Sequence, residues 1–330
     1  MKWTISSADY LKLARAVYAA FAKAFFNIQQ SEPQLIANLV WQLPNFINSV
    51  TLIGSTSIRS GAIFVHSQPF VSCGNFPSAK PDSVEIGDLL LLRTTVQAGT
   101  VTCRKALLLQ AKKFTSFPVL PDNVNQHHLY AYWPDFVYKR STKALNLQKR
   151  KIQGMDLYNG AKYLLIGNNS SYAYFGYYAD HILQLLHARD ALILTAQPTY
   201  PHLSHHQYFI QELIDFILGD AGKSYVRPAQ SGSLGWDQVI DDLISITANQ
   251  FTKYISNASG MRYETRGQFA FLAGSFQDIS VLSEVATQLN INTDGPPLVP
   301  DERMNGNGSD NSGISIIEFI VKSNEKASTE

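Results

Sequence analysis

The chain has 330 residues, of which 45 % are hydrophobic, and its 27 basic and 26 acidic side chains leave a net charge near +1. This length suits one large domain or two modest ones, and the apolar fraction is ordinary for a globular protein. The near-neutral balance excludes an overall basic field that would attract nucleic acid. The two cysteines, Cys73 and Cys103, lack the spacing of a CxxC or zinc motif, which favours a reducing, cytoplasmic compartment.

The N-terminal stretch predicts two helices. Apolar residues recur at helical spacing between Leu11 and Phe25, so residues 1–26 are expected to form an amphipathic helix packed on the core. Charged residues interrupt this stretch, which argues against a signal peptide, a membrane span and a membrane partner. A second helix is expected to begin with Ser31 as its N-cap and Pro33 in its first turn.

The rest of the chain alternates between apolar runs and polar turns, which predicts an α/β protein. Strands are expected at 50–53, 61–73, 84–95, 101–114, 160–168 and 191–198, helices at 121–138 (interrupted near Pro134), 205–219 and 236–255, and a loop or helix at 139–151. Residues 293–313 are rich in Pro, Gly and Asn, which is typical of a flexible linker. The apolar run 314–321 is expected to be a terminal strand at a sheet edge.

The segment KALLLQAKKF, residues 105–114, places polar side chains on a strand that is otherwise apolar. Gln110 and Lys112 are two positions apart, so both point to the same face of a strand. If the apolar runs on either side of Gly99 form an antiparallel hairpin, Asp88 lies opposite Gln110 and Lys112 lies on the adjacent diagonal. The three side chains are therefore expected on one face, at the open end of the hairpin.

This set of side chains has a chemical use. A carboxylate beside an amide oxygen suits Mg²⁺, which needs only one or two protein oxygens and keeps several waters. A neighbouring lysine can orient a water or stabilise charge at a scissile phosphate. Asp88, Gln110 and Lys112 therefore outline a site for phosphodiester hydrolysis. The alternative is that all three are polar residues at surface strand ends.

The order of a GD dipeptide, a hairpin and QAK resembles the PD-(D/E)xK nuclease superfamily, and more narrowly the Mrr-like restriction endonucleases, in which QxK is common. The flanking helices and the later buried strand are similar to the family's αβββαβ core, over about residues 1–170. Gly87–Asp88 stands in place of the family's Pro-Asp dipeptide. The resemblance implies a restriction-endonuclease-like core, a central mixed sheet flanked by helices. It also implies Mg²⁺-dependent endonuclease activity on DNA, rather than RNA, in restriction or anti-phage defence.

The same resemblance assigns roles to individual residues. It implies Asp88 as the metal-binding acid, Gln110 as the second ligand and Lys112 as the catalytic lysine, with Mn²⁺ able to replace Mg²⁺. Glu32 is the only acid near the second helix and is a candidate for the family's helix glutamate. Glu85 would face away from Asp88 on a regular strand, and a bulge between them would bring it round as a further ligand.

Residues 139–151 hold six basic side chains and no acid. Such a positive segment suits phosphate contacts, although a solvated helix face has the same composition. The candidate nucleic-acid contacts are Lys113, Lys139, Arg140, Lys143, Lys149, Arg150 and Lys151. Tyr130, Tyr132 and Trp133 could stack on bases, but core packing is the favoured role.

Two other motifs have plainer explanations. GDAGKS, residues 219–224, lacks the full spacing of a phosphate loop and follows a helix, so Gly219 is expected to be a helix C-cap. The histidines at 127–128 and within 202–206 lack the companion ligands of a zinc site.

The sequence thus predicts four segments: a nuclease core at 1–170, a mainly helical elaboration with one or two strands at 171–292, the linker at 293–313, and a terminal strand with a tail at 314–330. Two other functions fit the same residues. One is a non-catalytic nucleic-acid-binding or scaffold subunit of a defence complex. The other is a latent nuclease that a partner protein or a small signal activates through the C-terminal part. Self-association into a homo-oligomer is compatible with each.

Overall fold

The computed structural model describes residues 5–65, 69–152, 157–168, 191–233, 235–256, 270–275, 280–283 and 314–323. The helices are α1 (Ser7–Ala24), α2 (Glu32–Asn48), α3 (Val124–Tyr132), α4 (Leu157–Gly160), α6 (Phe209–Leu218) and α7 (Trp236–Ser256). The strands are β1 (Thr56–Val65), β2 (Phe70–Ser72), β3 (Val84–Glu85), β4 (Leu89–Gln97), β5 (Thr100–Phe114), β6 (Phe136–Arg140), β7 (Lys149–Arg150), β8 (Ala161–Asn168), β9 (Ala191–Gln197), β10 (Ser204–Tyr208), β11 (Lys223–Ser224), β12 (Ala270–Gly274) and β13 (Ser315–Ser323).

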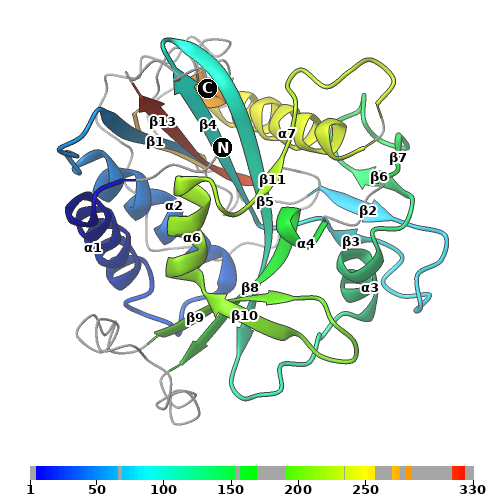
Figure 1. The fold of residues 1–330 in the computed structure, drawn as a ribbon. Coiled ribbons are helices and arrows are strands. Elements are labelled where there is room, and N and C mark those ends of the chain that lie inside the picture. Colours follow the sequence, from blue (N-terminus) through cyan, green and yellow to red (C-terminus); the bar gives the residue numbers. More distant parts are fainter. Residues whose placement is uncertain are drawn as a thin grey trace.

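A large mixed sheet lies at the centre, with helices on both of its faces (Figure 1). Its strand order is β10-β9-β8-β5-β4-β13-β1-β12, and β11 is added beside β5. A smaller sheet has the order β3-β2-β6-β7. The predicted α/β fold, with a central mixed sheet flanked by helices, is therefore confirmed. Strands from both sides of the predicted boundary at residue 170 share the large sheet.

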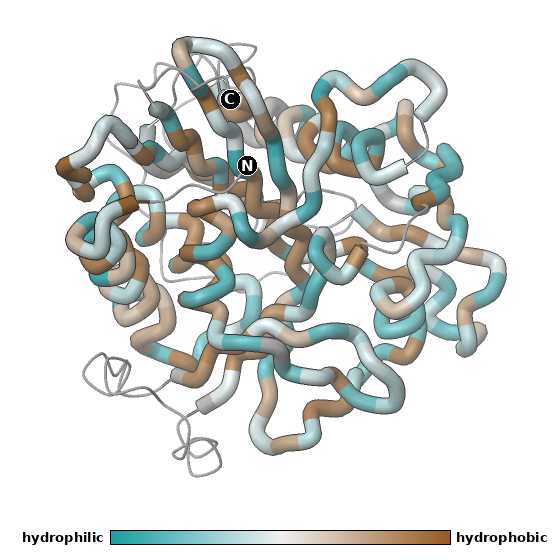
Figure 2. The backbone as a smooth tube through the Cα atoms, viewed as in Figure 1, coloured by the Kyte–Doolittle hydropathy of each residue, from teal (hydrophilic) through white to brown (hydrophobic). Residues whose placement is uncertain are grey.

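The central strands form one core on each face of the sheet. Leu107 and Leu109 of β5 pack with residues of α1, α2 and α6. Their neighbours Ala106 and Leu108 pack with α3, α7 and the smaller sheet. The tube in Figure 2 shows the hydrophobic residues concentrated along these strands. Since a strand covered on both faces has no solvent-facing side, it appears in sequence as a continuous apolar run, as in both arms of the hairpin.

The hairpin of β4 and β5 has the predicted register at its open end. Leu89 pairs with Leu109, which places Asp88 beside Gln110. A bulge near the turn shifts the register beyond Thr95, and the turn itself consists of Ala98 and Gly99. Both turn residues have positive φ, at 48° and 80°, as a two-residue hairpin turn requires.

Helix α2 begins as predicted, whereas α1 covers Ser7–Ala24 of the helix predicted at 1–26 and has Ser6 as its N-cap. Ser31 caps α2 with a capping box, and Pro33 lies in the first turn. The buried stripe of α1 differs in detail, because Leu11 is 44 % exposed while Leu13 and Ala20 are fully buried. Among the residues that the structure describes, none belongs to a helix with the length and apolarity needed to cross a membrane.

Four predicted elements require correction. Residues 50–53 form no strand, because Lys12 donates to the Thr51 carbonyl and the Ile53 N–H donates to Asp9. The helix predicted at 121–138 ends at Tyr132, because residues 136–140 form β6, while residues 141–148 form a loop before β7, which was one of the two alternatives for 139–151. Residues 205–208 extend β10 instead of α6. The terminal strand β13 lies inside the sheet, between β4 and β1, and not at an edge.

Two other expectations have different outcomes. Gly219 ends α6 in the left-handed conformation, with φ 95°, so the predicted C-cap is confirmed. The linker expected at 293–313 lies outside the described residues.

Candidate functional site

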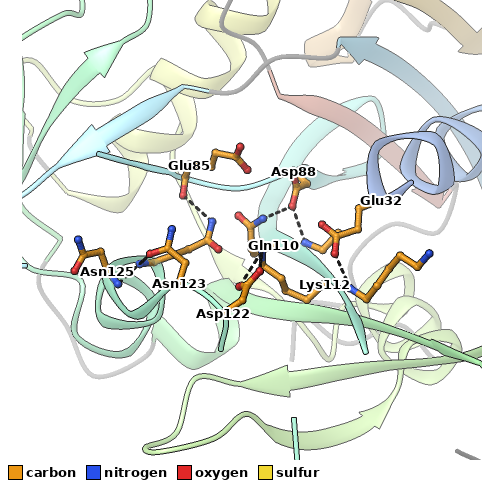
Figure 3. A network of polar contacts seen from close by, with 11 residues as sticks. Glu32, Glu85, Asp88, Gln110, Lys112, Asp122, Asn123 and Asn125 are labelled. Carbon is orange, nitrogen blue, oxygen red and sulfur yellow. Dashed lines mark hydrogen bonds and ion pairs between the residues drawn. The ribbon is translucent and has the colours of Figure 1, made fainter. Parts of the chain in front are cut away.

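Asp88 and Gln110 meet at the open end of the hairpin (Figure 3). The Nε2 amide of Gln110 donates a hydrogen bond to Asp88 Oδ2. The same oxygen accepts the backbone N–H of Ala111 at 2.7 Å. The Asp88 N–H donates to the Leu109 carbonyl at 2.9 Å, so β5 fixes both the backbone and the carboxylate of Asp88. The predicted pairing therefore brings these two residues together.

The Gln110 amide leaves one polar atom without a partner. Gln110 is only 2 % exposed, and its Oε1 accepts no hydrogen bond from any residue that the structure describes. A buried carbonyl oxygen without a donor costs about 1–3 kcal/mol. An orphaned acceptor beside a carboxylate is therefore a place where a cation or a proton donor would be stabilised.

Glu85 lies close enough to Asp88 for the two carboxylates to repel each other. Burial and, to a lesser extent, the Asp88 charge raise the pKa of Glu85 to about 8, although the Lys112 charge and a hydrogen bond with Gln110 act in the opposite direction. The chain reaches this position by leaving the small sheet after β3 and entering the large sheet at β4, not through a bulge in one strand. A Cβ atom at Gly87 would lie 2.7 Å from Leu108 Cδ1 and 3.1 Å from the Tyr130 hydroxyl, so a larger residue here would displace these two side chains.

Lys112 lies among acidic groups from several segments. Its ammonium pairs with the Asp122 carboxylate at 3.2 Å (Figure 3), and its side chain is 19 % exposed. Burial lowers the pKa of Lys112, but Asp122, Glu32 and Asp88 together leave the pKa raised. The side chain is therefore a charged ammonium at neutral pH.

Glu32, in the first turn of α2, is held against β5, because its Oε1 accepts the Lys113 N–H at 2.7 Å. Asp122 is a component of the cluster that sequence reasoning missed. It directly precedes Asn123, whose side chain caps α3, and only its place at the start of the helix predicted at 121–138 could have indicated it.

The described residues include no group of three or more His, Cys, Asp or Glu side chains arranged to hold a metal ion. His127 is buried and its Nε2 is 2.8 Å from the Thr199 carbonyl, so it has a structural role. A cation at the candidate site would instead take carboxylate oxygens together with the Gln110 amide oxygen.

Of the predicted nucleic-acid contacts, the fold leaves the lysines exposed and buries Arg150. Arg150 is buried in a bidentate pair with Asp242, with distances of 2.5 and 3.0 Å, so its assignment as a nucleic-acid contact is wrong. Lys149 is 60 % exposed and pairs with Asp135. The exposed lysines of the predicted set are Lys113, Lys139, Lys143, Lys149 and Lys151. Arg140 lies at the end of β6.

The aromatic residues near α3 serve mainly the core. Tyr130 and Trp133 are 2 % and 3 % exposed, so the favoured core role is confirmed for both. Tyr130 donates to the Ile86 carbonyl at 2.8 Å and so supports the bend before Asp88. Tyr132 is 61 % exposed.

Comparison of the chain with protein-family models, with curated proteins and with solved structures gives no match.

Proposed function

We propose that this protein is a Mg²⁺-dependent nuclease of the PD-(D/E)xK type that hydrolyses phosphodiester bonds in DNA. The observation that carries the proposal is the hydrogen bond from the Gln110 amide to Asp88, with Glu85 and Lys112 near enough to interact electrostatically with Asp88. A cation would pair with the orphaned amide oxygen and stabilise both carboxylates in their ionised forms. These features support a metal site over polar residues at surface strand ends.

The donor set fits a hard divalent cation. Asp88 and the amide oxygen of Gln110 would hold Mg²⁺, Glu85 would be a further ligand, and Glu32 would act from the outer side. Rotation of the Gln110 amide would turn Oε1 toward the cation and move its N–H group away from Asp88. When bound, Mg²⁺ supplies a Lewis acid that stabilises charge on a phosphoryl oxygen and lowers the pKa of a bound water. The open coordination positions would go to water and substrate.

Lys112 has the position expected for the lysine of such a site. Its ammonium would pair with a non-bridging phosphate oxygen or orient the attacking water. To do so it would exchange part of its interaction with Asp122 for the substrate. The exposed pairing makes this exchange inexpensive, since Asp122 is 70 % exposed.

Exposed lysines on both sides of the site would contact the nucleic-acid backbone. Lys113 follows Lys112 on β5, and Lys139, Lys143, Lys149 and Lys151 lie on or next to β6 and β7. Strands β6 and β7 belong to the small sheet, whose β3 ends at Glu85, whereas Lys113 lies with Gln110 and Lys112 on β5 of the large sheet. Backbone contacts of this kind give affinity without sequence preference.

The test is a nicking assay on supercoiled plasmid with Mg²⁺, Mn²⁺ or EDTA, using the parent protein and Asp88→Asn. We expect nicking with either metal, none with EDTA, and a loss of about 10²-fold or more in Asp88→Asn. Asp241→Asn is the matched control, because it also removes an acid paired with a basic side chain, that of Arg227, but lies on α7 outside the site and the proposed DNA contacts. Equal nicking by the parent and Asp88→Asn would refute the proposal. DNA binding without nicking would favour the scaffold function.

A further inference from the structure

Asp88 is held by backbone hydrogen bonds from two neighbouring strands. Its N–H donates to the Leu109 carbonyl on β5 at 2.9 Å. Its own carbonyl accepts the N–H of Ser315, the first residue of β13, at 3.3 Å. The parallel register places Ser315 beside Leu89. Because both sides of this residue are paired, the peptide units at Asp88 cannot turn without breaking one of the two bonds.

The beginning of β13 is in turn held by α7. The Thr247 hydroxyl donates to the Ile314 carbonyl at 2.8 Å, and the Ile314 N–H donates back to the same oxygen at 3.2 Å. Thr247 is 0 % exposed and Ile314 is 1 % exposed, so water does not compete for these groups. One side chain on α7 thus satisfies both backbone groups of the residue that precedes Ser315.

Ser315 has a second attachment, through its side chain. Its hydroxyl lies 3.5 Å from the Val65 carbonyl at the end of β1, which is at the limit of hydrogen bonding. The Thr247 bonds are therefore the stronger side-chain constraint on the beginning of β13. A threonine hydroxyl inside a helix often forms a hydrogen bond with a carbonyl of the same helix, whereas that of Thr247 bonds to the residue before β13.

We propose that α7 sets the position of Asp88 through the start of β13, and that Thr247 is a positioning residue of the candidate site. Only the catalytic consequence rests on the proposed function, because the coupling itself is a property of the fold. Loss of the Thr247 hydroxyl leaves both buried backbone groups of Ile314 unpaired. The beginning of β13 then separates more easily from β4, and the Asp88 carbonyl loses its donor.

The coupling can be measured by residue-resolved amide hydrogen exchange on the full chain without substrate. Thr247→Val keeps the volume and removes both hydrogen bonds, whereas Thr247→Ser keeps the hydroxyl. We expect exchange at Ser315 and Asp88 to be about tenfold faster in Thr247→Val and within about twofold of the parent in Thr247→Ser. In Thr247→Val, Mn²⁺ should bind several-fold more weakly, as measured by its electron paramagnetic resonance signal.

Thr195→Val is the matched control. Thr195 is also 0 % exposed and its hydroxyl also reaches a backbone carbonyl, that of Gln207, but it lies on β9 away from β13. This variant should leave exchange at Ser315 and Asp88 unchanged. If Thr247→Val does not fold, Thr247→Cys replaces it, because a thiol is a much weaker hydrogen-bonding group of similar size.

Exchange at Ser315 and Asp88 within twofold of the parent in the folded Thr247 variant would overturn the proposal, as would an equal effect of Thr195→Val. The exchange measurement needs no catalysis. A protein that shows the coupling but does not nick DNA would therefore refute the nuclease function alone.

Discussion

Two polar clusters lie on β5, β8 and their neighbours, one on each face of the large sheet, and they differ in how completely their atoms are paired. On one face, the Lys162 ammonium donates to both oxygens of Glu212 at 2.7 and 2.8 Å. Thr195 and Gln207 donate to the same carboxylate, at 3.3 and 2.7 Å. The Lys162 and Glu212 side chains are 4 % and 0 % exposed, so this is a buried ion pair with a complete set of partners.

The cluster on the opposite face has the reverse character. Glu85 and Asp88 repel each other, and the Gln110 Oε1 atom has no partner among the described residues. A cluster with all its partners is explained by the fold alone. A carboxyl group whose pKa is raised beside a carboxylate and an orphaned acceptor is typical of a ligand site. Both lysines are in ion pairs, but only Lys112 lies in a cluster that contains an acceptor without a partner among the described residues.

The largest expected effect is on cleavage in Lys112→Ala. Removal of an ammonium that acts on the phosphate or the attacking water should lower the cleavage rate about 10²–10⁴-fold. Divalent cations should bind more tightly to this variant, because a positive charge among the acids is gone. Plasmid nicking and Mn²⁺ titration check both effects. A variant that cleaves at the parent rate would place Lys112 with the structural lysines.

DNA affinity should respond to different lysines. Lys112→Ala should retain most of its affinity for DNA. Neutralising Lys143, Lys149 and Lys151 together should weaken DNA binding. It should also reduce the slope of the logarithm of the binding constant against the logarithm of the salt concentration, by up to about 0.9 for each phosphate contact that is lost. Gel-shift titrations over a range of salt concentrations measure this slope. An unchanged slope in the triple variant would remove β6, β7 and their connection from the DNA-binding surface.

The second largest effect should be on stability, in Lys162→Met. This change leaves Glu212 buried without its counter-charge, which typically costs about 3–5 kcal/mol of unfolding free energy. The double variant Lys162→Met/Glu212→Leu should recover most of that loss, since no buried charge remains. Urea unfolding of both variants measures the difference. If the single variant were as stable as the parent, pairing would not be what stabilises this face.

The same contrast explains what the sequence could and could not predict. Gln110 and Lys112 were identifiable because polar residues two apart on an apolar strand must share a face. Lys162 also interrupts an apolar run, yet its partner Glu212 comes from a distant helix, and only the tertiary fold pairs them. Arg150 was misassigned for the same reason, because its partner Asp242 lies on α7. A run of basic residues in the sequence indicates a local positive charge. It does not indicate which of these residues forms an ion pair with an acid from a distant segment.

The strand order shows a second limit. The hairpin register followed from local symmetry about Gly99, and the helix starts followed from capping residues. The insertion of β13 beside β4 involves residues more than two hundred positions apart, and no local pattern indicates which neighbour such a strand will choose. The site depends on both kinds of contact, because Asp88 is bonded to β5 and to β13.

A smaller effect is expected in the pH dependence of stability. Because the pKa of Glu85 is raised from 4.5 to about 8, the folded protein keeps a proton that the unfolded chain releases between these values. The unfolding free energy contributed by this group therefore falls as pH rises from about 4.5 to 8 and is constant above that range. Glu85→Gln should reduce this decline, as measured by urea unfolding at several pH values. Equal slopes for the variant and the parent would contradict the burial of Glu85 beside Asp88.

Magnesium should act on the same titration. A cation at Asp88 and Glu85 favours their ionised forms, so Mg²⁺ should raise the melting temperature of the parent more at pH 8 than at pH 5. Glu85→Gln should show a weaker dependence on pH. A stabilisation by Mg²⁺ that is independent of pH would place the cation elsewhere on the molecule.

The smallest expected effect concerns Asp122, which distinguishes orientation of Lys112 from charge alone. Asp122 is 70 % exposed, so Asp122→Asn should change the melting temperature very little. The amide that replaces the Asp122 carboxylate in this variant cannot form an ion pair with the Lys112 ammonium. We therefore expect kcat for plasmid nicking to fall by about three- to tenfold, which is less than the loss expected when a general acid or base is removed outright. KM should not rise, because the loss of a negative charge near Lys112 does not hinder the binding of a phosphate group. Asp122→Glu should recover most of kcat, and Asp241→Asn should leave both constants unchanged. A rise in KM with constant kcat would show that Asp122 acts on substrate binding instead of on the orientation of Lys112.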